Sequence, residues 1–467
     1  MCVSSADPFG VEVTREGGGR EVVWRAEAIA ATEHPVPAGA SADGCGWPAT
    51  LTIPVGDDWR SGFYSVALTS REERADAFFV VRAERDRSPI LLVLSTATYN
   101  AYNDWGGPSL YTGGTRVSFE RPLARGFLTK PEPAVRKAQT VPDKEALGYF
   151  TWAEEQGLSP WSGGSGWWTW ERPFIAWAER EGYAIDVAVS QDLEQHPEIM
   201  DGHRLFLSVG HDEYWSWGMR DAVEGFLAEG GNAAFFSGNT CWWQVRFGQE
   251  GRAMTCYKYR ADDDPVVGSD EQRFLTGSWS DRRLGRGENS MTGLSFSRGG
   301  YSRYGVGVPR ASGAYTVWRP DHWAFAGTDL RYGDALGLTD GIVGYEVDGC
   351  HLTMVGGLPV PTHEDGAPGT LEVLATAPAR LWSRDEQPSR YAREPGELEH
   401  VAAALWGEFA DANVHKIQHN HAVVGCFRAP GGGTVFNAGC TDWTYGIEGG
   451  DLEVRRITRN VLDRLSR

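Results

Sequence analysis

The central part of the chain alternates short apolar runs with an amphipathic stretch, which predicts a strand–helix–strand unit. Residues 205–209 are apolar and β-prone, as expected for a strand that is covered on both faces. An apolar stripe with helical spacing follows, formed by Met219, Ala222, Val223, Phe226 and Leu227. Gly230 and Gly231 then provide a helix C-cap, and a second apolar run covers 233–236. We therefore expect two parallel strands joined by a helix.

Similar runs elsewhere extend this unit to a larger sheet. Further strands are predicted at 90–94, 184–189 and 434–436, and helices at 173–182 and 452–465. The runs 422–427 and 434–436 flank a Pro-Gly-Gly-Gly turn at 430–433, which predicts a β-hairpin. The fold class that we expect is α/β with a mostly parallel sheet.

The pattern changes along the chain and predicts two domains. Residues 1–86 contain short alternating runs separated by Gly and Pro, which is typical of an immunoglobulin-like β-sandwich. The charged stretch 82–89 would be the linker, and 89–467 the α/β domain. Residues 113–170 are expected to form a loop-rich insert in this domain. Within 247–397, segments rich in Gly, Asp and Arg predict a β-rich insertion that caps the strand ends.

Composition narrows the function classes. The formal net charge of -19 disfavours nucleic acid and anionic membranes as partners. The chain contains no apolar run of transmembrane length and no signal peptide, so a cytoplasmic location is expected. Seven cysteines without a C-x-x-C pair predict neither a disulfide framework nor a zinc ribbon. Twenty tryptophans, many of them beside glycine, suggest a small enclosed site.

Polar side chains follow several predicted strands, where ligands of open α/β sheets bind. His211 and Glu213 stand two residues apart after 205–209, a spacing that suits a metal or a general base with its partner, although they could also cap the following helix. Asn239 follows the next strand, where its amide could hold a carbonyl or form a turn. Tyr99 and Tyr102 follow the strand at 90–94 and could supply hard oxygen ligands for ferric iron.

Two other groups offer alternatives. Cys241 has a strand–loop–helix placement like that of a nucleophile elbow, but it lacks flanking glycines at the usual spacing and is followed by two tryptophans. The histidines of the 415–421 segment could supply a base or a metal site, or hydrogen bonds at a strand start. Zinc bound by His211 and Glu213 is a further metal alternative.

Several motifs together resemble the large subunit of the N,N-dimethylformamidase family. They are Ala101-Tyr-Asn-Asp-Trp-Gly-Gly-Pro-Ser-Leu-Tyr111, Val117-Ser-Phe-Glu-Arg-Pro122, Gly210-His-Asp-Glu-Tyr-Trp215, Phe236-Ser-Gly-Asn-Thr-Cys-Trp-Trp-Gln-Val-Arg246 and Gly439-Cys-Thr-Asp-Trp443. The resemblance implies a class I glutamine amidotransferase-like (flavodoxin-like) layer without a cysteine-based triad. The chain is shorter than the family's large subunit, and the resemblance does not extend to a companion small subunit.

The resemblance also implies a mononuclear Fe(3+) centre held by two tyrosines and a glutamate. Glu213 and Tyr102 would be two of the ligands, and His211 and Asn239 would flank the substrate. A tyrosine is expected directly after the Arg-Pro segment, but Leu123 occupies that place, so Tyr111 or Tyr99 would be the second tyrosine by proximity. The substrate-binding residues implied by the motifs are Asn103, Trp105, Trp215 and Asp442.

The function predicted from these observations is hydrolysis of the C–N bond of a small amide, releasing formate and an amine. In this scheme iron polarises the carbonyl, His211 moves the proton and Asn239 orients the carbonyl. One alternative is a metal-free cysteine hydrolase or transferase using Cys241, and another is a non-catalytic binding protein with an aromatic cleft. The expected partner is a small amide. The sequence leaves open whether the chain forms a homo-oligomer.

Overall fold

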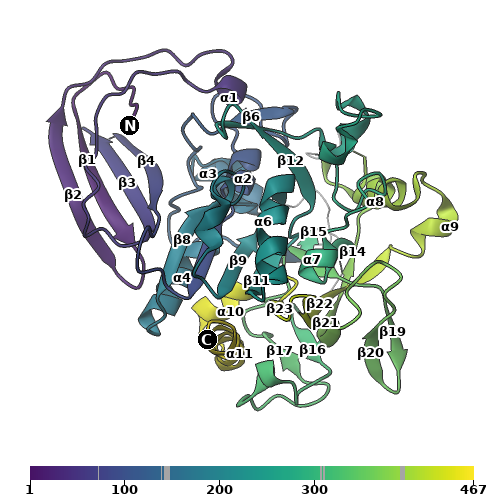
Figure 1. The fold of residues 1–467 in the computed structure, drawn as a ribbon. Helices are drawn as coiled ribbons and strands as arrows, with labels where there is room; N and C mark the ends of the chain where they lie inside the picture. Colours follow the sequence, from purple (N-terminus) through teal and green to yellow (C-terminus); the bar gives the residue numbers. More distant parts are fainter. Residues whose placement is uncertain (72, 138, 141–147, 306–307, 309–310, 390–394) are drawn as a thin grey trace.

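A large mixed β-sheet forms the centre of the protein in the computed structural model (Figure 1). The structure describes residues 1–71, 73–137, 139–140, 148–305, 308, 311–389 and 395–467. The part of the predicted loop-rich insert at 141–147 lies outside these residues. Within them, the central sheet has 11 strands, with the order β17-β16-β21-β22-β23-β11-β9-β5-β8 and with β14 and β18 attached beside this path.

One side of this sheet is parallel. Its strands are β8 (Ile185–Val189), β5 (Ile90–Leu94), β9 (Leu205–His211), β11 (Asn232–Gly238) and β23 (Thr434–Asn437). These strands lie at the sequence positions where apolar runs predicted them. They are almost completely buried, as strands with both faces covered should be.

The other side of the sheet is antiparallel, so the prediction of a mostly parallel, flavodoxin-like sheet is wrong. The antiparallel strands are β14 (Ser295–Tyr301), β16 (Tyr315–Val317), β17 (Ala335–Leu336), β18 (Glu346–Gly349), β21 (Glu372–Arg380) and β22 (His419–Arg428). The predicted hairpin is confirmed, because β22 pairs antiparallel with β23. The predicted insertion therefore does more than cap the strand ends, since most of its strands extend the sheet itself.

Helices cover both faces of the parallel strands. On one face lie α4 (Glu171–Arg180), α10 (Trp443–Gly449) and α11 (Leu452–Leu465), and on the other α5 (Ser190–Gln195) and α6 (Trp217–Ala228). Alternation along β5 separates the two cores: Leu92 belongs to the same buried cluster as the side chains of α4 and α11, whereas Leu91 belongs to that of α6. This arrangement fixes where the loops after β5, β9 and β11 emerge.

The N-terminal region contains one antiparallel sheet rather than a two-sheet sandwich. Its order is β2-β1-β3-β4, with β1 (Phe9–Glu16), β2 (Arg20–Ile29), β3 (Gly62–Ser70) and β4 (Glu73–Val81). The segment with Leu51, Ile53 and Trp59 covers one face. On the other face Phe63 stacks on Trp167 at 3.8 Å between ring centroids. The sheet is therefore docked on the α/β core; the predicted domain boundary stays a prediction.

Smaller strands and helices complete the structure. The short strands are β6 (Arg116–Ser118), β7 (Gln139–Thr140), β10 (Tyr214–Ser216), β12 (Trp243–Gly248), β13 (Ala253–Thr255), β15 (Tyr304–Gly305), β19 (Leu352–Val355) and β20 (Leu358–Pro361). The short helices are α1 (Ala40–Asp43), α2 (Thr96–Tyr102), α3 (Gly148–Glu155), α7 (Asn289–Thr292), α8 (Glu397–Trp406) and α9 (Asp411–Val414). Several of these elements contribute the walls of the cavity described next. No helix among the described residues is long and apolar enough to cross a membrane.

Candidate active site

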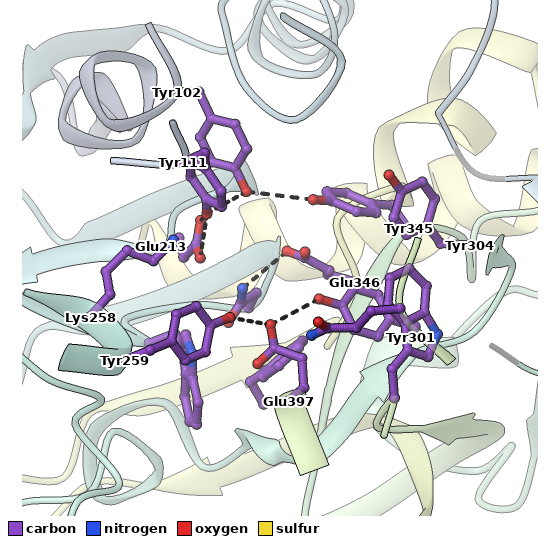
Figure 2. Close-up of a pocket in the computed structure, with 15 residues that line it drawn as sticks. Tyr102, Tyr111, Glu213, Lys258, Tyr259, Tyr301, Tyr304, Tyr345, Glu346 and Glu397 are labelled. Carbon is purple, nitrogen blue, oxygen red and sulfur yellow. Dashed lines mark hydrogen bonds between the residues drawn. The ribbon is translucent and has the colours of Figure 1, made fainter. Parts of the chain in front are cut away.

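A small, mostly aromatic cavity lies beyond the ends of β9 and β11 (Figure 2). Its volume of about 40 Å³ exceeds the ~10–15 Å³ that one water requires, and it suits a molecule of a few heavy atoms. The residues that line it are Tyr102, Tyr111, Glu213, Asn239, Trp242, Lys258, Tyr259, Phe296, Tyr301, Tyr304, Tyr345, Glu346, Trp382, Gln387 and Glu397. Three glutamates inside an aromatic wall make this the candidate active site.

Three oxygen-bearing side chains meet at one side of the cavity. The Tyr111 hydroxyl lies 2.7 Å from the Tyr102 hydroxyl, and 2.9 and 2.8 Å from the two carboxylate oxygens of Glu213. The Tyr214 hydroxyl donates to the Tyr111 hydroxyl at 3.0 Å, and the indole of Trp243 donates to Glu213 at 2.7 Å. The Tyr111 hydroxyl thus lies at the centre of a cluster of phenol and carboxylate oxygens.

Local structure explains how these side chains are held. Tyr102 is the last residue of α2, which follows β5, and Glu213 follows β9. The backbone N–H of Glu213 donates to the hydroxyl of Thr98 in α2 at 3.0 Å, which ties the two segments together. Gly210 at the end of β9 has φ of +81°, and a Cβ there would lie 2.5 Å from Trp170. Only glycine fits this position without strain.

His211, Glu346 and Asn239 form a second cluster beside the first. The Nε2 atom of His211 lies 2.6 Å from Glu346 and 3.4 Å from Glu213. The Nδ1 atom of His211 lies 2.6 Å from the Gly164 carbonyl, which can only accept, so Nδ1 carries a proton. Because Nε2 also faces a carboxylate, His211 is held as an imidazolium. Asn239 donates from Nδ2 to Glu346 at 3.0 Å, and within the described part of the chain its Oδ1 has no hydrogen-bond partner.

The pKa values follow from burial and from these close charges. Burial lowers the pKa of His211, but the carboxylates of Glu346 and Glu213 outweigh it and raise this pKa to about 9. Burial acts to raise the pKa of Glu346, yet the charge of His211 lowers it overall, whereas the pKa of Glu213 is raised by burial. Burial and the Glu213 carboxylate both raise the pKa of Tyr102 and Tyr111. Both effects favour the protonated form of the two phenols.

Two buried lysines bring positive charge to the cavity. The Lys258 ammonium lies 3.4 Å from the centre of the Tyr111 ring, and that of Lys137 lies 3.8 Å from the centre of the Tyr345 ring. Burial lowers the pKa of Lys137 to about 8. Figure 2 shows Lys258 close to Glu213 and Tyr259. The two ammonium groups offset part of the negative charge of the three cavity glutamates.

The structure brings together five of the residues predicted from sequence. Four of them line the cavity, namely Tyr102, Tyr111, Glu213 and Asn239. The fifth, His211, is outside the cavity lining and contacts both Glu213 and Glu346. Among the two tyrosines proposed by proximity, Tyr111 reaches Glu213, whereas the hydroxyl of Tyr99 bonds to Glu171. Tyr111 is therefore the better candidate for the second oxygen ligand.

The four predicted substrate-binding residues lie outside the cavity lining. Asn103 bonds to backbone groups, including the Pro122 carbonyl at 2.9 Å, and Trp105 packs edge-on against Trp47. Trp215 is buried on the opposite face of the sheet, because its ring packs on Phe206. Asp442 accepts from the backbone N–H of Tyr345 at 3.0 Å and from Trp170. Asp442 thus positions a cavity wall, and direct substrate contact by the four stays a prediction.

The alternative nucleophile and the histidine segment also lie away from the cavity. Cys241 is fully buried in the apolar cluster beneath α6, and burial raises the pKa of its thiol well above the usual value. A thiol in such a place is a poor nucleophile. His419 and His421 belong to β22 and do not line the cavity.

Sequence reasoning missed Glu346, Lys258 and Glu397. Glu346 begins β18 and lies near the end of a short β-like run at 341–347, which the sequence pattern assigns only to the insertion. Lys258 has a positive φ of 53°, a strained conformation for a residue with a side chain. Among the described residues, no cluster of three or more His, Cys, Asp or Glu side chains is arranged to hold a metal ion; the cluster around Tyr111 relies on phenol oxygens instead.

Known proteins resemble this chain over most of its length. The family model described as N,N-dimethylformamidase beta subunit-like, C-terminal, matches residues 10–456. Two curated relatives are both named N,N-dimethylformamidase beta subunit. The one from Alcaligenes sp is 25% identical over 337 residues, which is 67% of this chain and 43% of the relative. The one from Paracoccus aminophilus is 24% identical over 458 residues, which is 90% of this chain and 54% of the relative.

This chain thus spans about half the length of the curated relatives it matches. The family model, in contrast, covers nearly all of it, and the match includes every motif on which the resemblance was based. The chain therefore belongs to the N,N-dimethylformamidase beta subunit-like family.

Proposed function

We propose that this protein hydrolyses the C–N bond of a small amide, in the manner of a formamidase, and releases formate and an amine. The observation that carries the proposal is the convergence of Tyr102, Tyr111 and Glu213 next to the pair formed by His211 and Glu346. A cluster of oxygen ligands beside a proton-transfer pair is what metal-assisted hydrolysis requires. The names of the two relatives support the choice of a formamide as the substrate class.

We further propose that the three oxygen-bearing side chains hold a mononuclear ferric ion. The residues fit such an ion, because the hydroxyls of Tyr102 and Tyr111 and the Glu213 carboxylate are hard oxygen donors, and the Tyr111 hydroxyl lies 2.7 Å from that of Tyr102 and 2.8 Å from Glu213.

When bound, the ion would supply Lewis acidity that polarises the amide carbonyl. The protein's own groups move the protons. Glu346, whose pKa is lowered by His211, accepts a proton from the water as the water oxygen bonds to the carbonyl carbon. The C–N bond then breaks, and the nitrogen takes a proton that His211 donates from Nε2. The proton on Glu346 returns to His211 across their 2.6 Å contact, which restores the starting state.

Asn239 and the aromatic walls would control orientation and solvent access. The Nδ2 group of Asn239 already bonds to Glu346, which leaves its buried Oδ1 atom to accept a hydrogen bond from the water or from a substrate N–H. The aromatic rings around the cavity exclude bulk water, and this strengthens the electrostatic interactions inside it. The small cavity volume restricts the substrate to a few heavy atoms.

The first experiment is elemental analysis of the purified protein with its visible absorption spectrum, followed by a formate-release assay on formamide, N-methylformamide and N,N-dimethylformamide. Stoichiometric iron, a broad tyrosinate-to-iron band and formate release are expected. Iron-free protein that still releases formate would refute the metal proposal. Iron-free protein that releases none would favour the binding-protein alternative. Light scattering on the same sample would test whether the chain forms a homo-oligomer.

A further inference from the structure

The side of the cavity across from Tyr102 contains a third glutamate that the hydrolysis scheme does not use (Figure 2). Glu397 is the first residue of α8 and is only 8% exposed. Its Oε1 atom accepts a hydrogen bond from the hydroxyl of Tyr259 and a longer one, of 3.4 Å, from that of Tyr301. These two hydroxyls fix the orientation of the carboxyl group in the cavity wall.

The second oxygen of Glu397, Oε2, is buried and has no hydrogen-bond partner among the residues that the structure describes. The same is true of Oε1 of Gln387, another residue of the cavity lining, whose Nε2 group donates to the Pro395 carbonyl at 3.0 Å. A buried polar atom without a partner destabilises the folded protein, because it loses its hydrogen bonds to water and gains none in return. Two unpartnered acceptor oxygens in the wall of one small cavity therefore point to a ligand that donates hydrogen bonds to them.

The surroundings of these two oxygens make them selective. Phe296 and Trp382 also line the cavity and offer no acceptor on their rings, so a donor group there can bond only to the unpartnered oxygens or to other polar lining groups. Inside such a wall an amide with two N-alkyl groups leaves both oxygens unpaired. Sites built to bond a substrate N–H or O–H strongly reject analogues that lack it.

We infer that the amine portion of the substrate carries an N–H or O–H group that binds Oε2 of Glu397 and Oε1 of Gln387, so that donor-bearing amides are preferred over N,N-dialkyl amides. This inference rests on the proposed amide hydrolysis and names its substrate class. Glu397 is then a specificity residue: it bonds to the substrate on the amine side and takes no part in the proton transfers.

The test compares kcat/KM for three formamides in the wild type, Glu397→Gln and Gln387→Leu. N-methylformamide and N-(2-hydroxyethyl)formamide carry a donor on the amide and on the substituent, respectively, and N,N-dimethylformamide carries none. In Glu397→Gln the tyrosine hydroxyls keep the amide oxygen on their side, which turns an N–H donor toward the cavity. We expect the wild type to prefer at least one donor-bearing amide by about tenfold or more, and each variant to lose most of that preference.

Glu399→Gln is the matched control, because Glu399 lies on the same helix but does not line the cavity, and it should keep the wild-type preference. A wild type that prefers N,N-dimethylformamide, or variants that slow all three substrates equally, would overturn the inference.

Thermal-shift binding of the same three amides tests the donor site separately from the proposed hydrolysis. If no amide is hydrolysed, the hydrolysis proposal fails. The proposed donor site is still supported if only the donor-bearing amides stabilise the wild type and they do not stabilise Glu397→Gln. The donor site is refuted if all three amides bind the wild type equally.

Discussion

The Nε2 atom of His211 lies 2.6 Å from a carboxylate oxygen of Glu346, although the two residues come from opposite sides of the mixed sheet. His211 ends the parallel strand β9, and Glu346 begins the antiparallel strand β18. Neither half of the sheet contains the pair by itself. The antiparallel extension that the sequence analysis did not foresee thus supplies one member of the proposed proton-transfer pair.

Replacing Glu346 by Gln should abolish proton transfer and leave the oxygen cluster intact. General acid–base groups contribute about 10²–10⁴-fold, so kcat should fall by roughly that factor while iron content and the visible band stay unchanged. His211→Gln should behave alike, and the double variant should be little worse than either single one, because the two groups act as a unit. Additive losses, or loss of iron in Glu346→Gln, would contradict these roles.

Replacing Glu213 by Ala should remove both iron and activity while the fold is kept. The carboxylate is a proposed ligand, and its loss leaves two phenols whose pKa is raised by burial. Elemental analysis, formate release and circular dichroism measure the three effects, with Glu399→Gln as a glutamate control outside the cavity. An active variant with full iron content would refute the ligand assignment.

A pair of tyrosine variants distinguishes the two candidates for the second tyrosine ligand. Tyr111→Phe should weaken the visible band and lower iron occupancy, because the Tyr111 hydroxyl lies 2.8 Å from Glu213. Tyr99→Phe should keep both, since the Tyr99 hydroxyl bonds to Glu171 instead. The same change of one oxygen is made in each variant, so a larger loss of iron in Tyr99→Phe would show that Tyr99 is the ligand.

The parallel half of the fold was predictable because its strands carry continuous apolar runs and glycine caps. The run at 205–209 became β9, and the helical stripe from Met219 to Leu227 became part of α6. The antiparallel half was not predictable, because its short strands have no clear period and pair with partners far away in sequence. β16 (Tyr315–Val317), for example, pairs with β21 and β17, which sequence reasoning had no means to align.

The site residues on the parallel strands could likewise be predicted from the sequence, whereas those from other segments could not. His211, Glu213 and Asn239 follow long predicted strands, so their convergence could be expected from the topology of a parallel sheet. Glu346 and Glu397 come from segments without a recognisable strand-end motif. Trp215 belongs to a motif that suggested substrate contact, and its ring packs on Phe206 on the other face of the sheet. Its contact with the substrate stays a prediction.

Cys241→Ala should leave activity unchanged, because the thiol is fully buried outside the cavity and burial raises its pKa. Thiol alkylation of the native protein should likewise have no effect on formate release, although it labels the exposed Cys2. Cys2→Ser is the matched control for labelling. Loss of activity in Cys241→Ala with an unchanged melting temperature would revive the cysteine mechanism.

Asp348→Asn should stabilise the protein at alkaline pH. Asp348 is buried, its Oδ1 has no partner, and burial raises the pKa of its carboxyl to about 8 even though the backbone N–H of Thr240 donates to Oδ2. The folded state therefore keeps a proton that the unfolded chain, with a pKa near 3.9, releases at lower pH, so the free energy of unfolding falls as pH rises from about 4 to about 8.

Asn resembles the protonated acid at every pH. The variant should match the wild type near pH 4 and exceed it above pH 8, with a gain on the order of a few kcal/mol, since each pKa unit corresponds to about 1.4 kcal/mol. Denaturant unfolding at pH 5, 7 and 9 measures this gain. A difference between the two proteins that does not change with pH would show that Asp348 does not titrate in this range.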